Sequence, residues 1–152
     1  MKTLRRIREL ICESTRNILI PRGQINIPRY QMPQIEFKDY EEYFDLLRLR
    51  NIKIERVNLQ AKYLRAAQNE IDVSKVQKWA IHMPPDAARK PCIISKDKYI
   101  LDGNHTWLGY LNRDPNIRVS CYEIDLNIVD LLNITKLFDK VTNKTIKEEL
   151  DA

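Results

Sequence analysis

Residues 99–108 read YILDGNHTWL, a short apolar run that ends in aspartate, followed by a glycine and the start of a helical pattern. The β-type residues before Asp102 predict a strand, and the apolar spacing after Gly103 predicts a helix that begins at about Asn104. Proline disfavours helical geometry in the residue before it, so this helix should end before Asp114-Pro115. The sequence therefore predicts a strand that runs directly into a helix through a glycine.

The junction between this strand and helix is a candidate site for an anion. The first N–H groups of a helix have no partner inside the helix, and the helix dipole is positive there, so a phosphate is stabilised. Gly103 would let a ligand approach closely, while Asn104 and Thr106 would supply short polar groups. His105 can carry a proton near neutral pH, and Asp102 could orient it, hold a divalent ion or accept a proton. Alternatively, Asp102-Gly103 is a plain turn and Asn104 a helix cap, with the histidine facing solvent.

The segments around this unit also predict helices and strands. Asp39 can cap a helix that runs to about Arg50, and Asp72 can cap a second helix that ends at Pro84. The other patterns are β-type runs at 52–64, 91–95 and 117–125, a tight turn at 96–98, and helical periodicity over 127–150. This mixture predicts the α+β fold class.

The composition fits one globular domain. The chain has 152 residues, of which 43% are hydrophobic and 31% charged, enough to bury a core but too few for two domains of usual size. No window approaches the roughly 18 consecutive apolar residues of a membrane span, and the three cysteines have no C-x-x-C spacing. We therefore expect a soluble protein with no membrane partner, in a reducing compartment such as the cytoplasm.

The excess of positive charge lies mainly at the beginning of the chain. Lysine plus arginine number 26 against 21 for aspartate plus glutamate, a net charge of +5. Residues 1–22 hold six basic and two acidic side chains, which gives +4. Their spacing predicts a basic amphipathic arm, followed by an extended connector at 23–38 and a folded domain at 39–152; the stretch from Pro21 to Pro33, which favours the connector, holds three prolines. Such an arm could bind DNA through contacts with phosphates.

Three segments of the chain resemble the ParB/sulfiredoxin superfamily: residues 64–76, 90–95 and, most specifically, 99–108. The resemblance covers about residues 55–125 and implies a ParB/sulfiredoxin-like single domain with a small mixed sheet packed with helices. It also implies that nucleotide phosphates bind at the N-terminus of the helix that starts at Asn104. The nucleotide would be ATP or ADP, or alternatively CTP, with Mg²⁺ held by Asp102.

The motif of this sequence differs from each branch of that superfamily. Free serine kinases carry D-G-H-H-R, of which Asp102, Gly103 and His105 are retained. Asn104 stands where sulfiredoxins have their catalytic cysteine, so sulfinic acid repair is not expected, and the glutamate of the ParB motif G-E-R-R is absent. Thr106 replaces the arginine, which removes a bidentate phosphate clamp. Either nucleotide binding is weak or lost, or another cation substitutes, for which the candidates are Lys90, Lys75 and Arg89.

The resemblance implies a Mg²⁺-dependent phosphotransferase or phosphohydrolase, which could be a kinase, an ATPase or a nuclease. Gln68 and Lys90 would help to bind the nucleotide, and His105 would stabilise the transferring phosphoryl group. Glu70 or Asp102 would activate an acceptor hydroxyl or water. Glu70 could instead be an exposed acid that favours the dipole of the following helix. The alternative function is a non-enzymatic, DNA-associated module or a virion accessory protein.

The first 13 residues resemble the capsid-targeting propeptides of T4-like bacteriophages. A short basic helix follows Met1-Lys2-Thr3, and Ile11-Cys12-Glu13 matches the pattern of Leu or Ile, any residue, then Glu, after which the prohead protease of those phages cuts. This resemblance implies a mature chain that begins at Ser14, with a phage capsid and prohead protease as partners. The protein would lie in the host cytoplasm or be packaged in the virion. The alternative is an ordinary amphipathic N-terminal helix.

Overall fold

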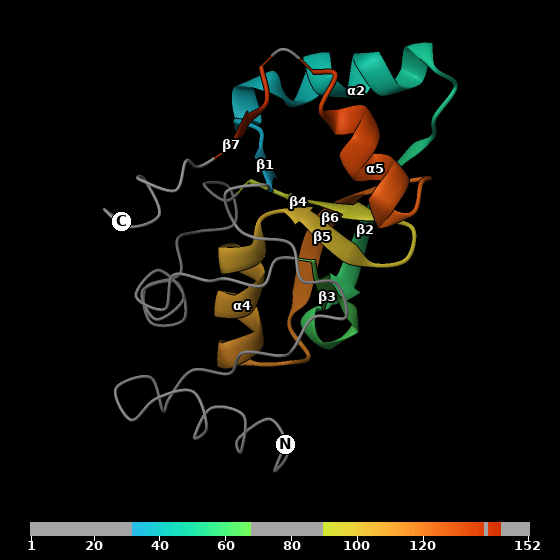
Figure 1. Ribbon diagram of the computed structural model, residues 1–152. Coiled ribbons are helices and arrows are strands. Elements are labelled where there is room, and N and C mark those ends of the chain that lie inside the picture. Colours follow the sequence, from blue (N-terminus) through green and yellow to red (C-terminus); the bar gives the residue numbers. More distant parts are fainter. Residues whose placement is uncertain (1–31, 68–89, 139, 144–152) are drawn as a thin grey trace.

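The computed structural model describes residues 32–67, 90–138 and 140–143, and these form a mixed α+β structure (Figure 1). In chain order the elements are β1 (Pro33–Gln34), the 3-10 helix η3 (Phe37–Asp39), α2 (Tyr40–Leu49), β2 (Ile54–Gln60), the 3-10 helix η4 (Ala61–Tyr63), β3 (Arg65–Ala66), β4 (Cys92–Ser95), β5 (Tyr99–Asp102), α4 (Asn104–Arg113), β6 (Arg118–Ile124), α5 (Ile128–Thr135) and β7 (Thr142–Asn143). The predicted α+β class is confirmed.

Five strands form a mixed sheet in the order β2-β6-β4-β5-β3. The pairs β4·β6 and β3·β5 are parallel, whereas β2·β6 and β4·β5 are antiparallel. A second, two-stranded sheet joins β1 to β7. The small mixed sheet packed with helices is therefore present as expected.

The central strands are buried on both faces and separate two apolar cores. Cys92, Ile94 and Ile100 pack with α4 on one face. Because side chains alternate along a strand, the intervening Ile93 and Leu101 point to the other face, where they pack with α2 and α5. Figure 1 shows this layering, with α4 on one side of the sheet and α2 and α5 on the other.

The predicted strand-to-helix junction is confirmed. β5 ends at Asp102, Gly103 occupies the N-cap position with φ of 105°, and α4 ends at Arg113, before the proline. The backbone N–H of Trp107 donates to Gly103 O at 2.9 Å, and the Trp107 indole N–H donates to Ala61 O at 2.7 Å. These bonds and the apolar face of α4 fix the start of the helix against the sheet.

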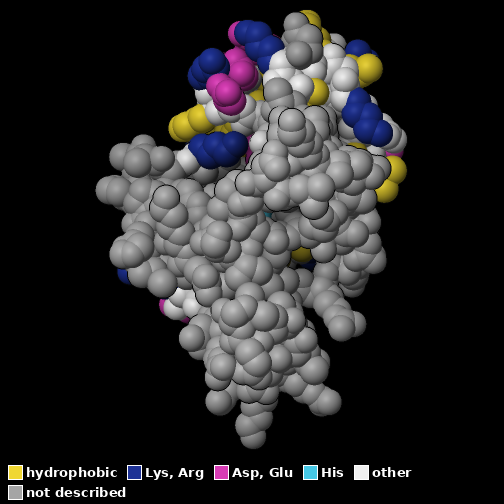
Figure 2. All heavy atoms as spheres, turned by 60° about the vertical axis from the view of Figure 1, so that its left-hand side comes forward, with side chains coloured by type: hydrophobic (Ala, Val, Ile, Leu, Met, Phe, Trp, Pro, Cys, Tyr) yellow, Lys and Arg dark blue, Asp and Glu magenta, His cyan; other side chains and the backbone are white. Residues whose placement is uncertain are grey.

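The predicted first helix is also present as α2. Its apolar stripe of Tyr40, Tyr43, Phe44 and Leu47 is fully buried, as expected from the spacing. Asp39 stands at the N-cap position, but its side chain makes no capping hydrogen bond, so the prediction of an aspartate cap is wrong. The exposed face of α2, at the upper end of Figure 2, carries both signs of charge and includes the ion pairs of Arg48 with Glu41 and Asp45.

The described end of the predicted connector is packed rather than free. β1 pairs with β7, and Met32 and Ile35 are 2% and 0% exposed within the core formed with α2 and α5. The folded unit therefore begins no later than Met32 and includes residues that the prolines had suggested to be a connector. Proline is tolerated as the first residue of a strand and in edge strands, and Pro33 is the first residue of β1.

The helix predicted over 127–150 is shorter than its periodicity suggested. α5 ends at Thr135, and the chain then turns so that Phe138 packs against Tyr43 with ring centroids 5.5 Å apart. Leu137, which fits the helical stripe, is 60% exposed. Further along, the chain forms β7, which pairs with β1, instead of continuing the helix.

Two predicted elements, the arm helix at 1–22 and the helix from Asp72 to Met83, lie outside the described residues. In the described part of the chain, no helix is long and apolar enough to cross a bilayer.

Candidate anion-binding site

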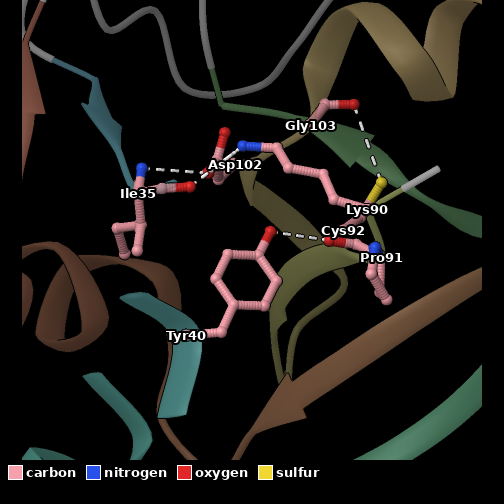
Figure 3. Close-up of polar contacts among 7 residues, drawn as sticks. All are labelled: Ile35, Tyr40, Lys90, Pro91, Cys92, Asp102 and Gly103. Atoms are coloured by element: carbon pink, nitrogen blue, oxygen red, sulfur yellow. Dashed lines mark hydrogen bonds and ion pairs between the residues drawn. The ribbon is translucent and has the colours of Figure 1, made fainter. Parts of the chain in front are cut away.

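Asp102 ends β5 as a buried carboxylate with two donors on one oxygen. Its Oδ2 accepts the Ile35 backbone N–H at 3.1 Å and the Lys90 Nζ at 3.0 Å. Lys90 Nζ also donates to Ile35 O at 3.0 Å (Figure 3). The predicted Asp102 and Lys90 are therefore brought together, and their pair holds the segment after β1 against the end of β5.

The Lys90 side chain extends from its contact with Asp102 toward the surface, because 34% of it is exposed. The ammonium lies 5.8 Å from the centre of the Tyr40 ring, within the range of a cation–π interaction. The Tyr40 hydroxyl donates to Pro91 O at 2.7 Å. Burial, and then the charge of Asp102, raise the pKa of Tyr40 far above its usual value, so the phenol stays a neutral donor.

Gly103 is required by the fold itself. A Cβ at this position would lie 2.7 Å from Cys92 Sγ, and the φ of 105° is one that side-chain-bearing residues rarely adopt. The Cys92 thiol donates to Gly103 O at 3.7 Å. Cys92 and Cys121 are register partners on β4 and β6, and their hydrogen bond, followed by burial, raises the pKa of the Cys92 thiol well above its ordinary value. The close approach at this glycine is thus made by Cys92.

A hollow of about 270 Å³ opens beside the first turn of α4. It lies at the start of β6, which is paired with β2 on one side but not with β4 on the other, because the pairing of β6 with β4 begins only at Cys121. Its charged and polar lining residues are Arg56, Lys90, Arg118, Asn58, Thr106 and Ser120. The rest of the lining is Pro91, Cys92, Tyr110 and Val119. We call this space the cationic hollow, because the described residues that line it include three cations and no carboxylate.

The two guanidinium groups of the cationic hollow have only neutral partners in the described part of the chain. Arg56 Nε donates to Ser120 Oγ at 3.0 Å, and Arg56 Nη1 donates to the Tyr122 hydroxyl at 2.9 Å. Its guanidinium lies 4.7 Å from the centre of the Tyr122 ring. Arg118 Nη1 makes one long contact, 3.5 Å to Asn58 O. Their positive charge is therefore available to an anion.

Of the residues predicted to form the site at the start of α4, Thr106 lines the cationic hollow and Asn104 and His105 do not. Thr106 lines the cationic hollow together with Lys90. Asn104 is 5% exposed, and its Oδ1 has no hydrogen-bond partner among the described residues. His105 is half-buried and is not one of the lining residues. Gln68 and Glu70, like Lys75 and Arg89, lie outside the described residues.

Arg56, Arg118 and Ser120 were missed by the sequence analysis. They lie on β2 and β6, which are about 60 residues apart in the chain and meet only through the register that pairs Asn58 with Ser120. Each of them lies in a β-type run that the sequence predicted, at 52–64 or at 117–125. The partner strand and its register carry no local signature.

The described residues fit an anion better than Mg²⁺. Asp102 is the residue that the sequence analysis proposed as the ligand of the ion, and its Oδ2 already accepts hydrogen bonds from Lys90 and Ile35. Within the described residues, no group of three His, Cys, Asp or Glu side chains could hold a metal. A divalent cation beside Asp102 would compete with the Lys90 ammonium, so no chemical step through Mg²⁺ follows from these residues.

Comparison with known proteins adds no relative. No family model, no curated protein and no solved structure matches the chain. The ParB/sulfiredoxin resemblance and the phage propeptide resemblance therefore depend on the quoted residues alone. The propeptide resemblance, with its capsid and protease partners, and the DNA contacts expected of the basic arm both concern residues outside the described part of the chain.

Proposed function

We propose that this protein binds the phosphate groups of a nucleotide in the cationic hollow, as a ParB/sulfiredoxin-like domain. The observation that carries the proposal is the lining itself, in which Arg56, Lys90 and Arg118 face a space of about 270 Å³ and no carboxylate is found among the described lining residues. Asp102 compensates Lys90, whereas Arg56 and Arg118 have only neutral partners among the described residues and repel each other unless an anion lies between them. The polar groups of Thr106 and Ser120 complete a surface suited to phosphate oxygens.

The start of α4 supplies the second part of the argument. Thr106 lies in the first turn of α4 and lines the cationic hollow, so the positive end of the helix dipole is directed near it. Helix starts of this kind bind phosphate through N–H groups that have no partner inside the helix. The hydroxyl of Thr106 and the ammonium of Lys90 add one neutral and one charged donor.

The size of the cationic hollow limits which part of a nucleotide it holds. Its volume of about 270 Å³ lies just under the range of about 300–1,000 Å³ that buries whole drug-sized ligands. We propose that the phosphates lie inside and that the base lies outside. The choice among ATP, ADP and CTP then depends on residues beyond the hollow.

Catalysis is a further part of the proposal and depends on a proton acceptor. Phosphoryl transfer needs positioning, charge stabilisation and a group that orients the attacking hydroxyl or water. Lys90 and the arginines would supply the charge, and His105 could assist from the same helix turn. Asp102 is engaged by Lys90, so Glu70, outside the described residues, is the proposed acceptor for a kinase, ATPase or nuclease reaction.

Calorimetric titration tests the proposal with ATP, ADP and CTP, each with EDTA and with Mg²⁺. We expect at least one nucleotide to bind the wild-type protein, and Thr106→Val to weaken that binding because it removes the hydroxyl and keeps the shape. Lack of binding by every nucleotide under both conditions contradicts the proposed function.

A further inference from the structure

We infer that the ligand of the cationic hollow carries at least two linked phosphate groups, the outer one held by Arg56 and Arg118. This inference rests on the proposed function and specifies its ligand class. One phosphate would occupy the wall formed by Lys90 and Thr106. The next phosphate would reach the opposite wall, which the paired strands β2 and β6 provide.

The strand wall presents both guanidinium groups on one face. Arg56 and Asn58 alternate along β2, and Arg118 and Ser120 alternate along β6, so all four side chains point to the same side of the strand pair. Both arginines are contacted from across the pair: Arg56 bonds to Ser120 Oγ, and Arg118 contacts Asn58 O. Ser120 thus lies between the two cations.

The partners of Arg56 orient its guanidinium without neutralising it. Hydrogen bonds to Ser120 and to the Tyr122 hydroxyl fix the plane of the guanidinium, whose central carbon lies 4.7 Å from the centre of the Tyr122 ring. A planar guanidinium held in this way is suited to bidentate contact with phosphate oxygens. Arg118 has one contact of 3.5 Å to a carbonyl, and an anion could therefore reorient it at little cost.

The charge of the site exceeds that of one phosphate. Asp102 offsets the charge of Lys90 at 3.0 Å. The two guanidinium charges and the partial charge of about +0.5 at the start of α4 then remain. A single phosphate group carries about −1.5 to −2 at pH 7, so one phosphate leaves a residual positive charge, which a second linked phosphate would more than offset. Diphosphates and triphosphates carry such a second phosphate, either as inorganic anions or as part of a nucleotide.

Titration calorimetry in EDTA with pyrophosphate and with inorganic phosphate tests the inference. We expect pyrophosphate to bind wild type at least about tenfold more tightly than phosphate, because charge-assisted hydrogen bonds each contribute a factor of this order. Arg118→Gln should weaken pyrophosphate binding about tenfold and change phosphate binding less than about twofold. Arg118→Lys, which keeps the charge but not the planar fork, should give an intermediate loss.

Arg50→Gln is the matched control, since it removes the same charge from an exposed residue at the end of α2 that does not line the cationic hollow. It should leave both affinities unchanged. Urea unfolding of Arg118→Gln should match wild type, because only the 3.5 Å contact is lost.

The outcomes separate the inference from the proposed function. If pyrophosphate binds no more tightly than phosphate, or if Arg118→Gln weakens both ligands equally, the two-phosphate assignment is wrong. If pyrophosphate binding falls with Thr106→Val but not with Arg118→Gln, the inference fails and the proposed function stands. If neither anion binds and no nucleotide binds, the proposed function fails.

Discussion

Replacement of Gly103 by alanine should destabilise the protein strongly, although the change adds one methyl group. The new Cβ would lie 2.7 Å from Cys92 Sγ and 3.3 Å from Cys92 Cβ, and the residue would keep a φ of 105°. A left-handed backbone costs an L-residue about 1–2 kcal/mol, and an extra methyl in a packed core costs about 1–3 kcal/mol. We therefore expect a loss of about 2–5 kcal/mol in the free energy of unfolding.

Urea unfolding followed by tryptophan fluorescence measures this loss, and thermal unfolding should show a fall in Tm of roughly 4–20 °C for a chain of this size. Cys92→Ala provides a matched test, because it removes the sulfur that the new methyl would meet. In the double variant Gly103→Ala/Cys92→Ala, the loss should be smaller than the sum of the single losses by about 1–3 kcal/mol.

A Gly103→Ala protein whose unfolding free energy lies within about 0.5 kcal/mol of wild type would contradict this expectation. Additive losses in the double variant would instead show that contact with Cys92 is not the cause. The backbone conformation would then account for the whole effect.

Three further predictions concern the ion pair, the thiol and the arm. Lys90→Met should lower the free energy of unfolding by about 1.5–3 kcal/mol, because it leaves the buried Asp102 charge without its cation. The double variant Lys90→Met/Asp102→Asn should recover part of this loss. Additive losses of the two single variants in urea unfolding would contradict the pairing. The raised pKa of Cys92 means that the folded state holds the thiol proton more tightly than the unfolded state does. The protein is therefore stabilised fully below the ordinary thiol pKa of 9.0. Above it, the free energy of unfolding falls by up to about 1.4 kcal/mol per pH unit. Unfolding at a series of pH values should therefore show a smaller alkaline loss in Cys92→Ala, and identical profiles would oppose this assignment. If the arm binds DNA, replacing the arginines of residues 1–22 by glutamine should weaken binding and reduce its salt dependence, whereas unchanged affinity in a filter-binding assay would exclude the arm.

Local patterns predicted the elements that surround the site. The run before Asp102 and the glycine after it predicted β5 and α4, and the later proline gave the end of that helix. These features are encoded within a few residues, as strand alternation, backbone freedom and the steric effect of proline. The end of α5 at Thr135 was not predictable in this way. It depends on contact of Phe138 with Tyr43, almost 100 residues earlier in the chain.

The candidate site was predicted in part for the same reason. Thr106 and Lys90 were proposed from the sequence, and the structure places both at the cationic hollow. Gly103 was expected to admit a ligand, but the structure shows that the absence of a side chain there makes room for Cys92. Arg56 and Arg118 could not be found from local pattern, because the register of β2 with β6 brings them together.

The most direct measurement of the central claim is a crystal structure of the full chain with a non-hydrolysable ATP analogue. We predict phosphate density inside the cationic hollow, in contact with Lys90 and Thr106 on one wall and with Arg56 or Arg118 on the other. A nucleotide bound with its phosphates elsewhere, or an empty hollow at saturating nucleotide concentration, would contradict it.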